Sequence, residues 1–185
     1  MRRSDESSGS LAGSLLLAHP VLRDPNFRRT VVLISAHSTG DGAVGAILNR
    51  PTGKLLSECD DSFEGDPLGK VPLSEGGPVG ADRVVFCGWR WVKSEGLFNL
   101  AYGVDPDQAR NLLDEGAVVR AFLGYSGWGE GQLEEELEHD SWVVTPLDAE
   151  MLGDEDGTSL WRSFLSRISP EFALLAASPE DPSVN

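Results

Sequence analysis

Short apolar runs, each bounded by Gly, Pro or charged residues, recur along the first half of the chain. The run at 14–18 is SLLLA, the run at 30–36 is TVVLISA, and the run at 43–48 is AVGAIL. Runs this short, rich in β-branched residues and bounded by turn formers, predict buried strands rather than helices. Gly45 lacks a side chain inside its run, which predicts a close approach to the backbone there.

The rest of the chain mixes further strands with a few helices. Asp105 and Pro106 are typical of a helix start, and Gly116 is typical of its end. A last helix is expected from the i, i+3, i+4, i+7 spacing of Trp161, Phe164, Leu165 and Ile168. We also expect strands at 71–74, 83–87, 96–102, 117–123 and 142–145, a helix at 132–138, a long surface connection over 50–70 with one helical turn, and no element after Pro170. Because strands and helices do not alternate regularly, the pattern indicates an α+β fold.

One domain is expected from a chain of 185 residues. We expect a loose polar leader at 1–10, a single domain over 11–177 and a frayed tail at 178–185. The apolar stretch after the leader is preceded by acids, contains Gly13 and ends in His19-Pro20, which does not match a cleaved signal peptide. No run reaches the ~18 apolar residues of a membrane-spanning helix, so no membrane association is expected.

The charge balance excludes whole classes of partner. Fifteen Lys and Arg stand against thirty Asp and Glu, which gives a formal net charge of -15. Such a surface repels phosphate backbones and anionic lipids, so nucleic acid is an unlikely partner. The two cysteines, Cys59 and Cys87, form no disulfide framework and no Cys-x-x-Cys motif. Their number fits a reducing compartment, and we expect a cytoplasmic protein with a buried, inert Cys87 and an exposed Cys59.

A glycine-rich segment at 124–131 is the most conspicuous candidate for chemistry. Glycines before a helix can bring free N–H groups to an anion, but no Gly-Lys-Ser/Thr follows and the spacing does not fit a dinucleotide fingerprint. Ser126 does not complete a Gly-x-Ser-x-Gly nucleophile elbow. Because several glutamates follow, we favour a structural strand-to-helix turn anchored by Trp128 over an anion site.

An acidic stretch at 130–156 holds eleven acids and no Lys or Arg, and is interpreted as a solvated face. Glu134 and Glu138 share a helix face at i, i+4, which is a weak basis for a hard cation. The three histidines do not pair with each other or with cysteine at metal-ligand spacing. We therefore expect no metal site and no cofactor.

Several motifs in one order resemble the YqgE/AlgH family of bacterial proteins. The resemblance runs from about Gly13 to Ile168. It is carried by GSLLLA at 13–18, DPNFRRTVVL at 24–33, GAVGAILNRP at 42–51, GGPV at 76–79 and GYSGWGEGQLE at 124–134. It implies a bent, branching, mainly antiparallel sheet with a small closed β-barrel, flanked by helices in a single domain. It implies no reaction, because the family has no established biochemical activity.

Three functional hypotheses follow. The first is a regulatory protein that binds an unidentified small molecule or protein partner, its oligomeric state open, through special turns that converge; its candidate residues are Asn49, Arg50, Gly76, Gly77, Pro78, Gly127, Trp128 and Gln132. Arg50, one of few cations, is expected to pair with a carboxylate. The second is a hydrolase with Glu134 or Glu136 as general base and Arg50 holding an anion in a glycine-rich cleft. The third is the transcriptional regulator that the AlgH name suggests, which the charge disfavours.

Overall fold

The apolar runs of the sequence become strands of one branched sheet. A computed structural model describes residues 9–92, 97–147 and 157–178. Within these residues the strands are β1 Ser14–Ala18, β2 Val31–Ser38, β3 Gly42–Ile47, β4 Pro51–Leu55, β5 Pro72–Glu75, β6 Val79–Val92, β7 Leu97–Val104, β8 Val118–Trp128 and β9 Trp142–Pro146. Residues 1–8 of the leader expected at 1–10, and residues 179–185 of the tail expected at 178–185, lie outside the described residues.

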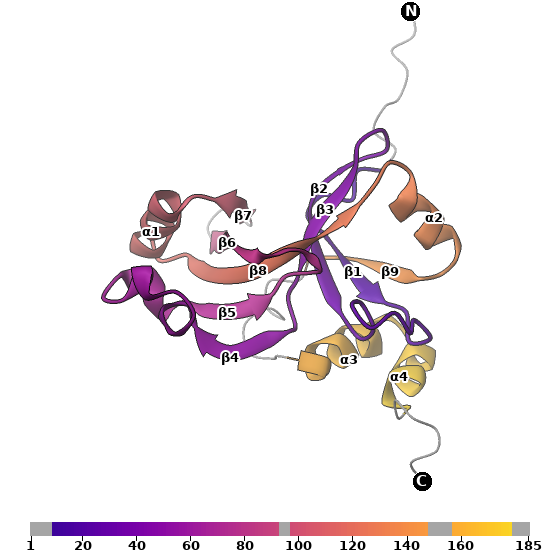
Figure 1. The fold of residues 1–185 in the computed structure, drawn as a ribbon. Helices are drawn as coiled ribbons and strands as arrows, with labels where there is room; N and C mark the ends of the chain where they lie inside the picture. Colours follow the sequence, from indigo (N-terminus) through magenta and orange to yellow (C-terminus); the bar gives the residue numbers. More distant parts are fainter. Residues whose placement is uncertain (1–8, 93–96, 148–156, 179–185) are drawn as a thin grey trace, which may run out of the picture.

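Strand β8 joins the two parts of the sheet. It pairs antiparallel with β6 along its first part, parallel with β5 over residues 121–123, and antiparallel with β3 over residues 126–128. The main path runs β4-β5-β8-β3-β2-β1-β9, and β7 is joined through β6 (Figure 1). All pairs except β5–β8 are antiparallel, as expected. Within the described strands this path does not close on itself, so the small closed barrel that the resemblance implied is not confirmed.

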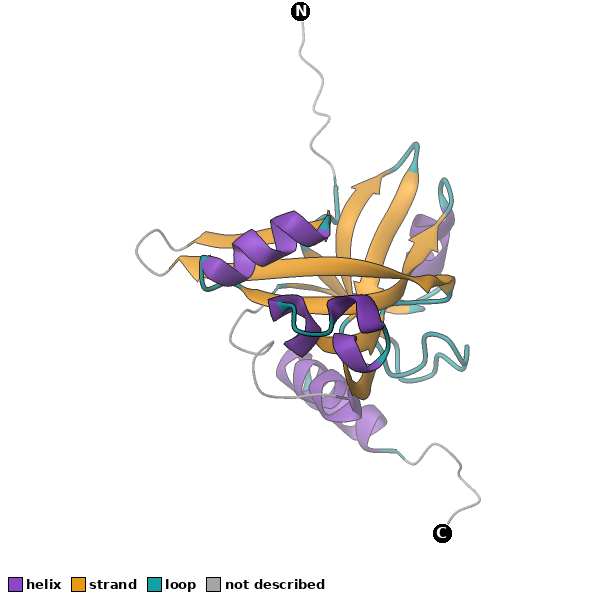
Figure 2. Cartoon of the chain, turned by 60° about the vertical axis from the view of Figure 1, so that its left-hand side comes forward, coloured by secondary structure: helices purple, strands orange, loops and turns teal. Residues whose placement is uncertain are grey.

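Helical segments cover the sheet on several sides (Figure 2). They are η1 Leu56–Glu58, η2 Asp61–Phe63, η3 Pro67–Lys70, α1 Pro106–Asp114, α2 Gln132–Glu138, α3 Gly157–Ile168 and α4 Pro170–Ala177. The expected start of α1 is confirmed, because the Asp105 carboxylate accepts a hydrogen bond from the Gln108 N–H at 2.8 Å. Gly116 ends this helix region with a φ of +77°. No described helix is long and apolar enough to cross a membrane.

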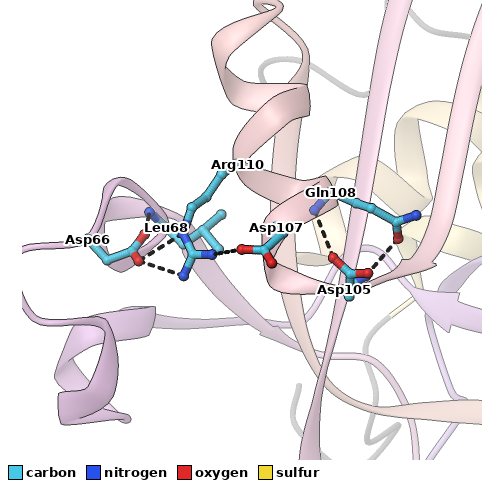
Figure 3. A network of polar contacts seen from close by, with 6 residues as sticks. All are labelled: Asp66, Leu68, Asp105, Asp107, Gln108 and Arg110. Atoms are coloured by element: carbon cyan, nitrogen blue, oxygen red, sulfur yellow. Dashed lines mark hydrogen bonds and ion pairs between the residues drawn. The ribbon is translucent and has the colours of Figure 1, made fainter.

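A polar network fastens α1 to η3 (Figure 3). Arg110 donates from Nε and Nη2 to one oxygen of Asp66 at 2.9 and 2.8 Å, and from Nη1 to Asp107 at 2.6 Å. The other Asp66 oxygen accepts from the N–H of Leu68 and caps η3. Both contacts favour the carboxylate and hold the pKa of Asp66 below its usual value.

Strand β1 is buried on both faces, which explains its unbroken apolar run. Leu15 and Leu17 belong to a core with α3 and α4 that includes Trp161 and Phe164. Leu16 and Ala18 face the opposite core, which is closed by α2, Trp128 and Trp142. Successive strand residues point to opposite faces, so a strand covered on both sides needs no polar alternation. A third core lies between α1, the η segments and strands β5, β6 and β8.

Four expectations are corrected. The glycine-rich segment is not a turn over 124–131, because β8 continues through it to Trp128. The connection over 50–70 has its expected helical turn but also contains strand β4 and the buried Leu56 and Leu68. Helix α4 begins at Pro170, after which no element was expected. Ile168 is 39% exposed, although its three helix partners are buried.

The two cysteines differ as expected. Cys87 is buried on β6, and burial raises the pKa of its thiol to about 12, so it is not a nucleophile near neutral pH. Cys59 is exposed. The close approach predicted at Gly45 is also confirmed, since a Cβ there would lie 2.4 Å from the Leu33 carbonyl oxygen.

Candidate functional site

The Gly76-Gly77-Pro78 turn lies between the end of β3 and the middle of β8. The Gly76 carbonyl accepts from the Ile47 N–H at 2.9 Å and from the Ser126 hydroxyl at 3.1 Å. The Gly76 N–H donates to the Leu123 carbonyl at 2.8 Å. These contacts bring together the segments around Arg50, the Gly-Gly-Pro turn and the first part of the glycine-rich strand. They also occupy Ser126, which is fully buried and therefore not a nucleophile.

Both glycines of this turn are required by backbone contacts. A Cβ at Gly76 would lie 2.4 Å from the Gly124 carbonyl oxygen. At Gly77 φ is +150°, and a Cβ would lie 2.3 Å from the Tyr125 carbonyl carbon. Side chains are excluded at both positions, so the turn can seat directly on β8. The turn is therefore a fixed element of the sheet rather than a loose connection.

A pocket of about 300 Å³ opens beside this turn. Its polar lining comes from three segments: Asn26 on the loop before β2, Arg50 after β3 and Glu75 at the end of β5. Its remaining lining is mostly apolar and consists of Ile47, Gly77, Pro78, Ala81 and Leu123. A concave, mostly apolar site with a few polar groups is typical of small-molecule pockets.

Arg50 is half-buried in this pocket and does not pair with a carboxylate, contrary to expectation. Its Nη2 donates to the Pro25 carbonyl at 3.2 Å and makes a long contact of 3.5 Å with the Arg28 carbonyl. None of the ion pairs among the described residues includes Arg50. Partial burial lowers the pKa of its guanidinium, and the nearby carboxylate of Glu75 opposes that shift. An arginine stays protonated in such surroundings, so the Arg50 guanidinium carries a positive charge that forms no ion pair among the described residues.

Asn49, next to Arg50, is a structural residue. It is 4% exposed, and its Oδ1 accepts from the Val31 N–H at 2.8 Å. Its Nδ2 donates to the carbonyls of Arg29 and Gly157, both at 2.9 Å. The amide thus ties β2, the loop before it and the start of α3 together, and little of it is left for a ligand.

Trp128 and Gln132 lie in a different cluster, centred on Glu136. One Glu136 oxygen accepts from the indole N–H groups of Trp128 and Trp142, at 2.9 and 2.7 Å. The other accepts from Gln132 at 3.0 Å. Phe27 stacks on Trp128 with ring centroids 5.9 Å apart. The Glu136 carboxylate thus links aromatic side chains at the edge of the core, and both of its oxygens already accept hydrogen bonds.

Glu134 is also engaged, in a pair that the sequence did not suggest. Its Oε1 lies 2.8 Å from His37 Nε2, and His37 Nδ1 accepts from the Leu11 N–H at 3.0 Å. An Nδ1 that accepts carries no proton, so Nε2 is the donor to Glu134. Contacts with its own N–H and with His37 lower the pKa of Glu134. The pair joins β2, α2 and the segment before β1.

The structure does not assemble the hydrolase arrangement. Neither Glu134 nor Glu136 lines the pocket at Arg50, and both accept hydrogen bonds elsewhere. Gly127 pairs with Val44 inside the sheet and lies outside the pocket as well. Within the described ranges, no three His, Cys, Asp or Glu side chains gather as they would around a metal ion.

Asn26 and Glu75 are pocket residues that sequence reasoning missed. Asn26 lies on a turn that Asp24 organises, since its carboxylate accepts from the N–H groups of Asn26 and Phe27. The sequence DPNF is a recognisable turn signal. Its position beside Arg50 arises only from tertiary folding. Glu75 directly precedes the Gly-Gly-Pro turn, which was the one available sign of its place.

Comparison with known proteins gives one consistent result. The model of the AlgH-like family matches residues 15–173. A UPF0301 protein of Chlorobium limicola is 38% identical, with 94% of this chain and 95% of the relative aligned. A UPF0301 protein of Streptomyces coelicolor is 37% identical, over 95% and 96% of the two chains.

Two solved structures share the fold. The solution structure of the AlgH protein from Pseudomonas aeruginosa matches with a TM-score of 0.67 and 28% identity, over 98% of this chain and 100% of that one. A crystal structure of a Corynebacterium diphtheriae protein matches with a TM-score of 0.68 and 23% identity, over 96% and 95%. The likeness extends over nearly the full length in every case.

Proposed function

The chain belongs to the AlgH-like family, and from that premise we propose that it is a small-molecule-binding regulatory protein whose ligand presents an anionic group to Arg50. The names of its relatives state no reaction, so the proposal depends on the pocket. We place its action in the cytoplasm, in agreement with the low cysteine content.

The proposal depends mainly on the hydrogen bonds of the Arg50 guanidinium. Its guanidinium is half-buried in a pocket of about 300 Å³, yet among the described residues it donates only to the carbonyl oxygens of Pro25 and Arg28. A partly desolvated arginine with spare N–H donors is well suited to a carboxylate or a phosphoryl oxygen. An anionic ligand would replace the solvation that burial has removed.

The backbone offers a second donor in the same place. Gly77 lines the pocket, and among the described residues its N–H has no backbone acceptor. A free N–H beside an arginine adds directional recognition to charge. The contacts that fix the turn on β8 also fix this N–H, so the site is formed before the ligand arrives.

Thermal unfolding with and without small anions tests the proposal. Short aliphatic carboxylates and inorganic phosphate serve as probes, with wild type, Arg50→Ala and Arg90→Ala. The last variant removes one positive charge at an exposed position outside this pocket. A probe at a hundred times its Kd adds about 2.7 kcal/mol, or about 5–10 °C in Tm for a chain of this size.

The two variants give opposite expectations. We expect the shift to disappear in Arg50→Ala and to persist in Arg90→Ala. The same shift in all three proteins would place anion binding elsewhere and contradict the proposal. Wild-type protein that no probe stabilises would contradict it as well.

A further inference from the structure

Two opposite charges line the pocket without neutralising each other. Arg50 and Glu75 both belong to its wall, but no ion pair within 4.0 Å among the described residues joins them. They are near enough for Glu75 to act on the pKa of Arg50 through its charge. A hydrogen bond from the Glu75 N–H to the Arg50 carbonyl, 2.9 Å long, fixes the two residues side by side. The side chains therefore present separate positive and negative ends.

A purely anionic ligand uses only one of these ends. A phosphate at Arg50 would be attracted by Arg50 and by the nearby Arg28, and it would be repelled by Glu75 and Asp24; the charges of all three neighbours reach Arg50. The chain as a whole carries a net charge of -15, which adds to the repulsion. A ligand with both an acceptor and a cationic donor satisfies Arg50 and Glu75 together.

The rest of the wall selects for an apolar body. Ala81 and Leu123 contribute aliphatic surface, Pro78 adds a rigid ring, and Ile47 lies almost wholly buried behind them. None of the described residues that line the pocket carries a hydroxyl group. With about 300 Å³ of space, the pocket is at the small end of ligand sites. It suits a compact aliphatic group rather than a nucleotide.

We infer that the ligand is a free α-amino acid with a short aliphatic side chain. Its carboxylate binds Arg50 and the Gly77 N–H, its ammonium group binds Glu75, and its side chain lies against Ala81 and Leu123. The inference rests on the proposed ligand pocket and names the ligand class of that same site. No bond is made or broken in this binding.

Three probes of nearly equal size separate the two charged contacts. Leucine carries both groups, isocaproate is leucine without the amino group, and isoamylamine is leucine without the carboxylate. Titration of the ¹⁵N-labelled full chain, followed by NMR shifts of backbone amides such as Gly77, gives a Kd for each. A charge-assisted hydrogen bond corresponds to roughly tenfold in affinity or more. We expect leucine to bind at least about tenfold more tightly than either analogue.

Two variants assign the contacts to residues. In Glu75→Gln we expect leucine to fall to the affinity of isocaproate, while isocaproate binding is maintained or strengthened. In Arg50→Gln we expect both ligands to lose about tenfold or more. Glu115→Gln is the matched control, because it removes one exposed carboxylate outside this pocket and should leave all affinities unchanged.

The outcomes distinguish the inference from the proposed function. If isocaproate binds as tightly as leucine and Arg50→Gln weakens both, the anion pocket stands and the amino-acid inference is overturned. If phosphate binds more tightly than leucine, the inference is likewise overturned. If no probe binds, or if Arg50→Gln changes nothing, both the inference and the proposed function fail. If N-acetyl-leucine binds as tightly as leucine, the ammonium group is not needed for binding. The site would then fit the C-terminal end of a peptide, and the inference of a free amino acid would be overturned.

Discussion

Replacing Asn49 with alanine should cost stability rather than ligand affinity. The amide makes three hydrogen bonds, of 2.8, 2.9 and 2.9 Å, to Val31, Arg29 and Gly157. Asn49→Ala removes all three and leaves the N–H of a fully buried residue, Val31, without its acceptor. Two carbonyl groups on separate segments lose their donor at the same time.

The cost follows from these contacts. The two hydrogen bonds to the carbonyls of Arg29 and Gly157 are worth about 1 kcal/mol each, and the buried Val31 donor left unpaired costs about 1–3 kcal/mol. Together they predict a loss of about 3–5 kcal/mol, a large part of the ~5–15 kcal/mol that stabilises a typical domain. For a chain of this length the Tm should fall by about 10 °C or more.

Urea denaturation followed by tryptophan fluorescence measures this loss. Asn26→Ala is the matched control for stability, because Asn26 is exposed and its side chain makes no hydrogen bond that the structure describes. It should change stability by no more than about 0.5 kcal/mol. Asn49→Asp should be at least as unstable as Asn49→Ala at pH 7, since a carboxylate would face two carbonyl oxygens. A loss below about 1 kcal/mol in Asn49→Ala would refute the reasoning that this amide ties three segments together.

Three further outcomes are expected, all measurable by urea denaturation. Gly77→Ala should lower stability by about 3 kcal/mol, because its Cβ would meet the backbone of β8. Gly53→Ala, at a residue with φ +74° and nothing within 4 Å of a Cβ, should lower stability by only about 1 kcal/mol. Equal losses in the two variants would contradict this. Glu136→Ala leaves the indole N–H groups of Trp128 and Trp142 without their acceptor and should cost about 3 kcal/mol of stability. Glu135→Ala, at an exposed position, should be near neutral. The folded-state pKa of Asp66 is lowered, so its contribution is present above the unfolded pKa of about 4 and is lost as pH falls through the folded value. The stability difference between wild type and Asp66→Asn should therefore narrow below about pH 4, and a difference constant with pH would argue against this contribution.

Local signals explain what the sequence predicted correctly. The run at residues 14–18 forms a strand because both of its faces are covered, which is what an unbroken apolar run requires. The helix after Asp105 begins and ends at residues whose capping contacts are local. Neither element depends on a partner that the sequence fails to reveal.

Tertiary contacts explain the features that could not be predicted from the sequence. Gly124 was interpreted as part of a turn, but its φ of +67° lies inside β8, where the carbonyl oxygens of Gly77 and Val79 leave no room for a Cβ. Strand β4 is mostly exposed and contains Pro51 and Gly53, so no periodicity marked it. Arg50 and Gly77, which line the pocket, were candidate binding residues because of their unusual local sequence. Glu75 was not a candidate, because only the tertiary fold brings it next to Arg50.

The shared strand β8 has a consequence for how the chain folds during synthesis. Strands β3 and β5 both pair with β8, which follows them in sequence after β6, β7 and α1. A nascent chain therefore presents the unpaired edges of β3 and β5 until residue 128 has left the ribosome. Exposed edges of this kind are prone to aggregation and to slow, non-local pairing. We expect C-terminally truncated chains that end before β8 to require chaperones, and the two halves of the sheet to form in one late, cooperative step.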